Sequence, residues 1–256
     1  MAYNINTKLD SSFYEHWYKP HTEFDMVGPN LIKLPSYYSF DLDKVRKQVR
    51  EIEEGPGYKP FIYGNRTRTT YQGIGLTAKP GAEDPLYDAL GLYDKDDNML
   101  NIKDTVEGRS LIEKKVNVAV STDTNFSQPT DINTGYIAEV LSKFKSTLTK
   151  VRLLNLKRKG ILTPHVDYPY YEQIRLHATI VESPTAWWEV EGDRFQIPAD
   201  GNFYWLDVGK CHAVWNEGTQ NRVVMSVNLS PYKDRDGNVT HGPETKLEDL
   251  IKDCKL

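Results

Sequence analysis

The sequence predicts a mainly β protein with an antiparallel sandwich or barrel in its C-terminal half and flanking helices mostly in its N-terminal half. Two observations support this fold class. Residues 151–229 contain short apolar segments separated by Gly, Pro and polar turn residues, and helical periodicity appears twice before residue 150. Because no internal repeat or linker divides the 256 residues, we expect a single domain over residues 1–256.

Two N-terminal segments carry apolar residues at helical spacing. The first helix is expected to begin after the capping residue Asp41 and to end at Gly55-Pro56. Its apolar face is formed by Leu42, Val45, Val49 and Ile52. The second helix is expected to begin after Asn133 or Thr134. Its apolar face is formed by Ile137, Val140, Leu141, Phe144 and Leu148. Strands are expected between the helices near residues 68–76 and 116–121, so residues 1–149 form helices, loops and outer strands.

The central part of the chain, residues 150–230, is expected to be the β core. The candidate strands are residues 151–158, 174–182, 186–190, 194–197, 203–208, 212–216 and 222–229. Residues 231–256 follow with a hairpin-type turn at Asp236-Gly237 and a short amphipathic helix. The apolar residues of that helix are Leu247, Leu250 and Ile251.

Composition and charge exclude several classes of partner. The net charge is −4 and the pI is about 5.9, which favours neither a nucleic-acid partner nor an anionic membrane surface. No segment approaches the roughly 18 apolar residues of a membrane span, and the N-terminus has no signal-peptide pattern. Cys211 and Cys254 are too few for a disulfide framework. We therefore expect a cytoplasmic protein, with Cys211 as a small packed thiol.

Three side chains form a candidate metal site. His165 and Asp167 make an H-x-D pair just after Pro164, at or just beyond a strand end, and residues two apart in an extended segment project from the same face. His212 begins a later strand. Two imidazoles and one carboxylate on one side of a metal leave other positions open, which is typical of non-haem iron(II) oxygenases. The alternatives are a non-catalytic cupin-like protein with a structural metal and a hydrolytic zinc enzyme.

Arginines near these residues suggest an anionic ligand. Arg222 lies near the start of the last core strand, and Arg175 and His177 form an R-x-H pair. A buried arginine needs an anionic partner, so two of them could bracket a dicarboxylate. Surface ion pairs of Arg175 with Glu172 or Glu182, and simple packing of His177, are the structural alternatives.

The segments HVDYPYYEQIRLH and GNFYWLDVGKCHAVWNEGTQNRVVMSVNL resemble the aspartyl/asparaginyl β-hydroxylase family, which includes free-proline cis-hydroxylases and belongs to the 2-oxoglutarate-dependent oxygenases. The resemblance covers roughly residues 150–230. It implies a double-stranded β-helix, that is, a jelly-roll or cupin-like core. It also implies Fe(II) held by His165, Asp167 and His212, with O2 and 2-oxoglutarate as cosubstrates.

The resemblance further implies that Arg222 binds the distal carboxylate of 2-oxoglutarate, with Arg175 and His177 near its metal end. The presence of Asp167 favours hydroxylation over halogenation. Asn216 matches a recurrent family position of unassigned role, and the family often has Asp where this chain has Asn228.

The implied reaction hydroxylates a C–H bond of an amino acid, a peptidyl residue or a related small metabolite, with release of succinate and CO2. Tyr168 could line the substrate site, and Arg66 and Arg68 could clamp a substrate carboxylate. A solvated edge strand explains the two arginines equally well. Trp187 and Trp188 are adjacent, so at most one of them faces the site.

Overall fold

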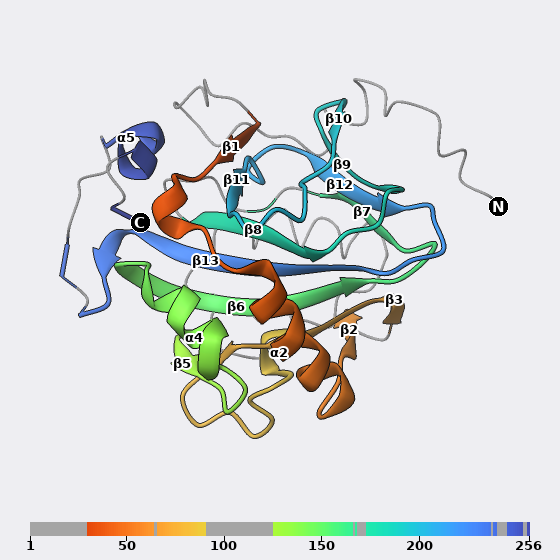
Figure 1. Ribbon diagram of the computed structural model, residues 1–256, viewed down its shortest axis with the longest axis horizontal. Coiled ribbons are helices and arrows are strands. Elements are labelled where there is room, and N and C mark those ends of the chain that lie inside the picture. Colours follow the sequence, from red (N-terminus) through yellow and green to blue (C-terminus); the bar gives the residue numbers. More distant parts are fainter. Residues whose placement is uncertain are drawn as a thin grey trace, which may run out of the picture.

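Two antiparallel β-sheets face each other and contain most of the regular structure (Figure 1). The computed structural model describes residues 30–63, 66–90, 125–165, 167, 173–236, 238–239, 245–252 and 255–256. The expected strand at residues 116–121 therefore lies outside the described residues. Among those described, no helix is long and apolar enough to cross a membrane.

The large sheet has seven strands and the small sheet has four. In spatial order, the large sheet consists of β1 (Leu31–Lys33), β11 (Tyr204–Leu206), β8 (Ile174–Val181), β13 (Arg222–Asp234), β6 (Ser146–Leu156), β3 (Arg66–Gly75) and β2 (Lys59–Tyr63). The small sheet consists of β10 (Asp193–Phe195), β9 (Ala186–Val190), β12 (His212–Asn216) and β7 (Ile161–His165). The remaining elements are the pair β4 (Thr77–Ala78) and β5 (Gln128–Pro129), the helices α2 (Leu42–Glu54), α4 (Gly135–Ser142) and α5 (Leu247–Lys252), and the 3-10 turns η1 (Ser36–Tyr38) and η2 (Asp88–Leu90).

Helix α2 forms as its sequence predicts. The Asp41 side chain accepts hydrogen bonds from the backbone N–H groups of Asp43 and Lys44, and the helix ends before Gly55. Helix α4 begins after Thr134 but is shorter than the periodicity suggests. It ends at Ser142, and Leu148 lies in β6, because the chain enters the sheet before the apolar pattern stops.

The outer face of the large sheet packs against the helices. Val223, Met225 and Val227 of β13 belong to the same buried apolar cluster as the inner residues of α2 and α4. In Figure 1 these two helices lie on the opposite side of β6 from β9 and β12. The alternate positions of β13, including Arg222 and Ser226, therefore face the small sheet.

A second apolar cluster joins the two sheets from the inside. It contains Leu156 and Leu206 of the large sheet together with Trp188 and Val214 of the small sheet. Two facing antiparallel sheets with this shared interior confirm the expected jelly-roll core. The strand list omitted β7, which is short and interrupted by Pro164. At the C-terminal end, Lys233 and Val239 form an antiparallel bridge and α5 buries Leu247, Leu250 and Ile251, while Gly237 of the expected turn lies outside the described residues.

Candidate metal and cosubstrate site

The two histidines of the candidate metal site are cross-strand neighbours. His165 is the last residue of β7 and His212 is the first residue of β12, and they lie directly opposite each other in the small sheet. Their ring centroids are 4.3 Å apart. A register shift occurs between His212 and Val214, opposite the position of Pro164. Proline has no backbone N–H to donate to the neighbouring strand. The irregular strand pairing at this point therefore accommodates Pro164 next to the site.

Backbone hydrogen bonds orient both imidazoles. Nδ1 of His165 lies 2.7 Å from the Thr163 carbonyl oxygen, and Nδ1 of His212 lies 2.9 Å from that of Lys210. A carbonyl only accepts, so each Nδ1 carries a hydrogen and each Nε2 is the ring nitrogen left to bind a metal. Burial, and then the neighbouring His165, lowers the pKa of His212 to about 3. The His212 ring is therefore neutral near neutral pH, as a metal ligand must be.

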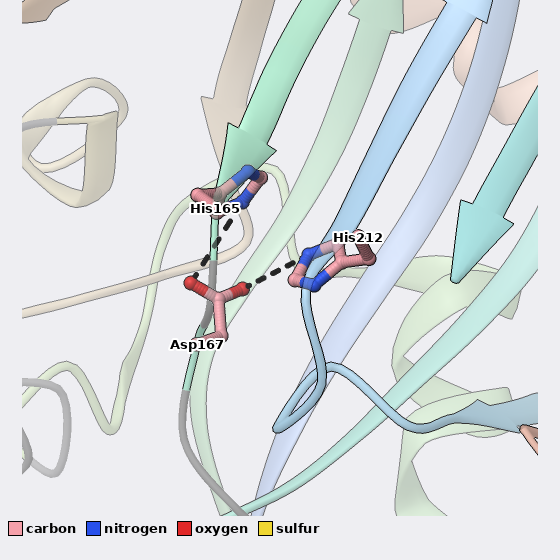
Figure 2. Close-up of side chains that lie close together, drawn as sticks. All are labelled: His165, Asp167 and His212. Atoms are coloured by element: carbon pink, nitrogen blue, oxygen red, sulfur yellow. Dashed lines mark ion pairs between the residues drawn. The ribbon is translucent and has the colours of Figure 1, made fainter. Parts of the chain in front are cut away.

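Asp167 lies between the two free imidazole nitrogens (Figure 2). Its Oδ1 is 3.9 Å from Nε2 of His165, and its Oδ2 is 3.7 Å from Nε2 of His212. The Asp167 N–H donates to the Val208 carbonyl oxygen over 2.8 Å, which fixes the backbone just beyond β7. Donor atoms of the three side chains all lie within 4.8 Å of one another. Two imidazole nitrogens and one carboxylate at this spacing fit a divalent transition metal.

Arg175 pairs with the metal-site carboxylate. Its Nη1 donates to Oδ2 of Asp167, and its Nε donates to Oδ1 of Asn228 over 2.9 Å. Burial alone would raise the pKa of Asp167, but Arg175 and then the two histidines hold it well below its usual range. The Asp167 carboxylate is therefore ionised. Of the two acidic partners in the structural alternative, Glu182 accepts a hydrogen bond from the Ala199 N–H, and Glu172 lies outside the described residues.

Four more side chains meet between the sheets, and we call them the inner polar cluster. They are His177 of β8, Trp188 of β9, and Arg222 and Ser226 of β13. All four are at most 5% exposed. Burial, and then Arg175 and Arg222, hold the pKa of His177 well below its usual value, so that ring is neutral. Burial lowers the pKa of Arg222 to about 10, which leaves it cationic at neutral pH.

The inner polar cluster contains polar atoms without hydrogen-bond partners among the described residues. They are both ring nitrogens of His177, Nε1 of Trp188, Nη2 of Arg222 and Oγ of Ser226. Orphaned buried polar groups are rare in folded proteins because each one loses its hydration without compensation. Arg222 and Trp188 can only donate, so the missing partner must accept hydrogen bonds. A carboxylate ligand fits these donors.

The remaining candidates have mixed outcomes. Arg66 and Arg68 lie in β3, but their side chains and the whole of Tyr168 are outside the described residues. Asn216 has a structural role, because its Nδ2 donates to the backbone oxygens of Leu156, Lys157 and Gln220, and its Oδ1 accepts from the Ser183 hydroxyl.

Sequence reasoning assigned no role to Trp188 or Ser226. The alternation of β9 and β13 places both inside, but only the cross-sheet packing shows which neighbours they meet. Cys211 is buried, as expected for a packed thiol.

Comparison with solved structures gives distant similarities. A 2OG-Fe(II) oxygenase family oxidoreductase from Burkholderia pseudomallei is 9% identical, with 82% of this chain and 89% of that chain covered and a TM-score of 0.43. A prolyl hydroxylase in complex with a hypoxia-inducible-factor peptide fragment, from Trichoplax adhaerens, is 11% identical, with 82% and 88% covered and a TM-score of 0.41. The α-ketoglutarate-dependent epimerase SnoN from nogalamycin biosynthesis is 12% identical, with 80% and 78% covered and a TM-score of 0.42. Similarities this distant carry no functional argument, and no curated protein matches the sequence.

A family model gives the informative comparison. Residues 119–231 match the model described as Aspartyl/Asparaginyl beta-hydroxylase. The matched segment contains all three candidate metal ligands and the whole inner polar cluster. It confirms the resemblance predicted from the H-x-D, R-x-H, His212 and Arg222 pattern, and it favours an oxygenase enzyme over a non-catalytic cupin-like protein. Residues 119–231 of this chain are thus similar to the aspartyl/asparaginyl β-hydroxylases, a family of oxygenases, over the part of the chain that holds the site.

Proposed function

We propose that this protein is an Fe(II)- and 2-oxoglutarate-dependent dioxygenase that hydroxylates a C–H bond of an amino acid, a peptidyl residue or a related small metabolite. The observation that carries the proposal is the convergence of His165, Asp167 and His212, with both Nε2 atoms free and facing one ionised carboxylate. Three protein ligands leave coordination positions for other molecules, which an oxygenase requires.

The chain's own residues have distinct tasks in this proposal. His165, Asp167 and His212 hold the iron, and Arg175 orients the Asp167 carboxylate through the bond to its Oδ2. Arg222 binds the distal carboxylate of 2-oxoglutarate with its buried guanidinium, and His177 offers a neutral donor nearer the metal. When bound, iron and 2-oxoglutarate supply the oxidising chemistry, in which O2 is consumed and succinate and CO2 are released.

Burial is the physical reason why these residues suit the task. Arg222 and His177 are 5% and 3% exposed, so water does not screen their interaction with a bound anion. Their position between the sheets also excludes bulk water from the reacting atoms. Arg66, Arg68 and Tyr168 stay predictions for contact with the substrate, because their side chains lie outside the described residues.

The direct test measures succinate formed from 2-oxoglutarate in the presence of Fe(II), ascorbate and O2. The wild-type protein should turn over 2-oxoglutarate, at least without coupling to substrate, and His165→Ala should not. Lys33→Gln, which removes an exposed ion pair to Asp200, is the matched control and should behave as wild type. A substrate panel of free amino acids and peptides, followed by mass for an added oxygen atom, then identifies the class. Absence of any iron-dependent turnover across that panel would refute the enzyme assignment.

A binding experiment tests the role of Arg222 separately. Arg222→Ala should weaken the binding of 2-oxoglutarate to the metal-loaded protein while metal affinity is retained, because Arg222 contacts none of the three metal ligands in the described structure. Equal affinity of both proteins for 2-oxoglutarate would overturn that role.

A further inference from the structure

Trp188 occupies a central position in the inner polar cluster. Its ring centroid is 4.8 Å from that of His177 and 6.1 Å from that of His212, and the guanidinium carbon of Arg222 lies 5.1 Å from it. Trp188 therefore spans the space from the metal-ligating histidine to the proposed carboxylate-binding arginine. It comes from β9 of the small sheet, whereas His177 and Arg222 come from the large sheet.

The neighbouring Trp187 is not part of this arrangement. Adjacent residues of a strand point to opposite faces, and Trp187 is only partly buried, whereas Trp188 is 4% exposed. The chain therefore offers two tryptophans next to each other, one inside and one outside. Substitution of each tryptophan in turn therefore distinguishes a loss caused by removal of the interior indole of Trp188 from a loss caused by any tryptophan substitution in β9.

The indole N–H of Trp188 is buried and has no acceptor among the described residues. Nearby side chains cannot provide an anionic acceptor. Arg222 only donates, and the neutral His177 has one acceptor nitrogen for several surrounding donors. A tryptophan needed only for packing would normally place its N–H against a carbonyl or solvent. The ring that carries this orphaned N–H instead packs against a guanidinium that also lacks a partner for its Nη2.

We propose that Trp188 is a further ligand-binding residue of this site, whose indole N–H donates to the same ligand carboxylate that pairs with Arg222. The inference rests on the proposed function and names one more residue of the cosubstrate site. The Trp188 ring also packs against the Arg222 guanidinium, so it holds the cationic donor in place and adds a neutral donor beside it. A carboxylate has two oxygens, and the two donors can each serve one of them.

The test compares Trp188→Phe with Trp187→Phe by calorimetric titration of the manganese(II)-loaded protein. Phenylalanine keeps an aromatic ring next to Arg222 and removes the N–H. The ligands are 2-oxoglutarate, 2-oxobutanoate, which lacks the distal carboxylate, and glutarate, which lacks the keto group. Trp188→Phe should raise the Kd for 2-oxoglutarate and glutarate roughly tenfold or more, the effect of one hydrogen bond to a charged group. The Kd for 2-oxobutanoate should not change.

Manganese affinity and melting temperature show whether Trp188→Phe is folded, since its metal ligands are intact. Trp187→Phe should bind all three ligands as wild type does. An unchanged Kd for both dicarboxylates in Trp188→Phe would overturn the inference, and so would an equal loss for all three ligands, which indicates a packing role. Failure of the wild type to bind 2-oxoglutarate refutes the proposed function. If glutarate still binds in a Trp188-dependent way, the donor role of Trp188 stands without that function.

Discussion

Replacement of Arg175 by glutamine should destabilise the metal-free protein much more than the metal-loaded protein. Arg175 is the cationic partner of the ionised Asp167 carboxylate, which also faces Nε2 of His165 and Nε2 of His212. Arg175→Gln keeps a polar side chain but removes this charge. A bound divalent cation would supply the missing charge, so loading the site should reduce the loss.

The magnitude follows from the burial of the pair. Removal of one partner of a fully buried ion pair costs about 3–5 kcal/mol, and an exposed pair contributes about 0–1 kcal/mol. The side chains of Arg175 and Asp167 are 11% and 22% exposed, which is close to the buried limit but leaves some access for water. We therefore expect a loss of about 2–3 kcal/mol in the free energy of unfolding without metal. The linkage between metal binding and folding then requires a smaller loss with metal present.

Urea unfolding with and without manganese(II) measures both values. Lys33→Gln is the control for an exposed pair, because its partner Asp200 and Lys33 itself are 31% and 52% exposed, and it should lose less than about 1 kcal/mol. Two results would refute the reasoning. One is an Arg175→Gln protein as stable as wild type without metal, and the other is an equal loss in both states.

Three further substitutions test other parts of the structure. Burial, only partly opposed by Lys210, raises the pKa of Asp207 to about 6, so its contribution to stability is present at acidic pH and is lost as pH rises through 6. Wild type should lose roughly 2 kcal/mol in the free energy of unfolding through this group between pH 4 and pH 7, and Asp207→Asn, measured by urea unfolding, should not show that loss. Asp41→Ala removes the α2 cap and should lower the free energy of unfolding by about 1 kcal/mol, measured the same way. Gly201→Ala should lower the melting temperature more than Gly81→Ala, since both have positive φ but only at Gly201 would a Cβ meet a backbone oxygen, that of Phe40, at 2.4 Å. Equal melting temperatures for the two alanine variants would contradict the steric argument.

Regular elements with strong local signals were predictable from the sequence. The Asp41 cap and the Gly55 stop specify α2 independently of the rest of the fold, and β8, β9 and β12 have apolar runs bounded by turn residues. The end of α4 was not predictable, because the apolar residues of the helix and of β6 follow each other without interruption. The pairing of β6 with its neighbouring strands decides where α4 ends.

The convergence of His165, Asp167 and His212 was predictable because their residue types and spacing are typical of a metal site. The contacts that orient these side chains were not predictable from the sequence. Asn228 stands where the family often has Asp, and its carboxamide oxygen accepts from Arg175 and so helps to aim that guanidinium at Asp167. Trp188 gave no signal beyond strand alternation. Contacts of this kind join strands that are distant in sequence, and no local pattern encodes them.

The architecture gives the three ligands unequal freedom. His165 and His212 are opposite each other in one sheet, and a backbone carbonyl orients each ring, so strand pairing fixes both nitrogen donors before any metal binds. Asp167 lies beyond the end of β7 and is held by one backbone bond to Val208 and by Arg175. The two histidines should therefore set the position of a bound cation, and the carboxylate is the candidate ligand that can adjust. Because a cation at this site would compete with Arg175 for that carboxylate, we expect the Asp167–Arg175 pair to be the part of the site where metal affinity can be changed without disturbing the sheet.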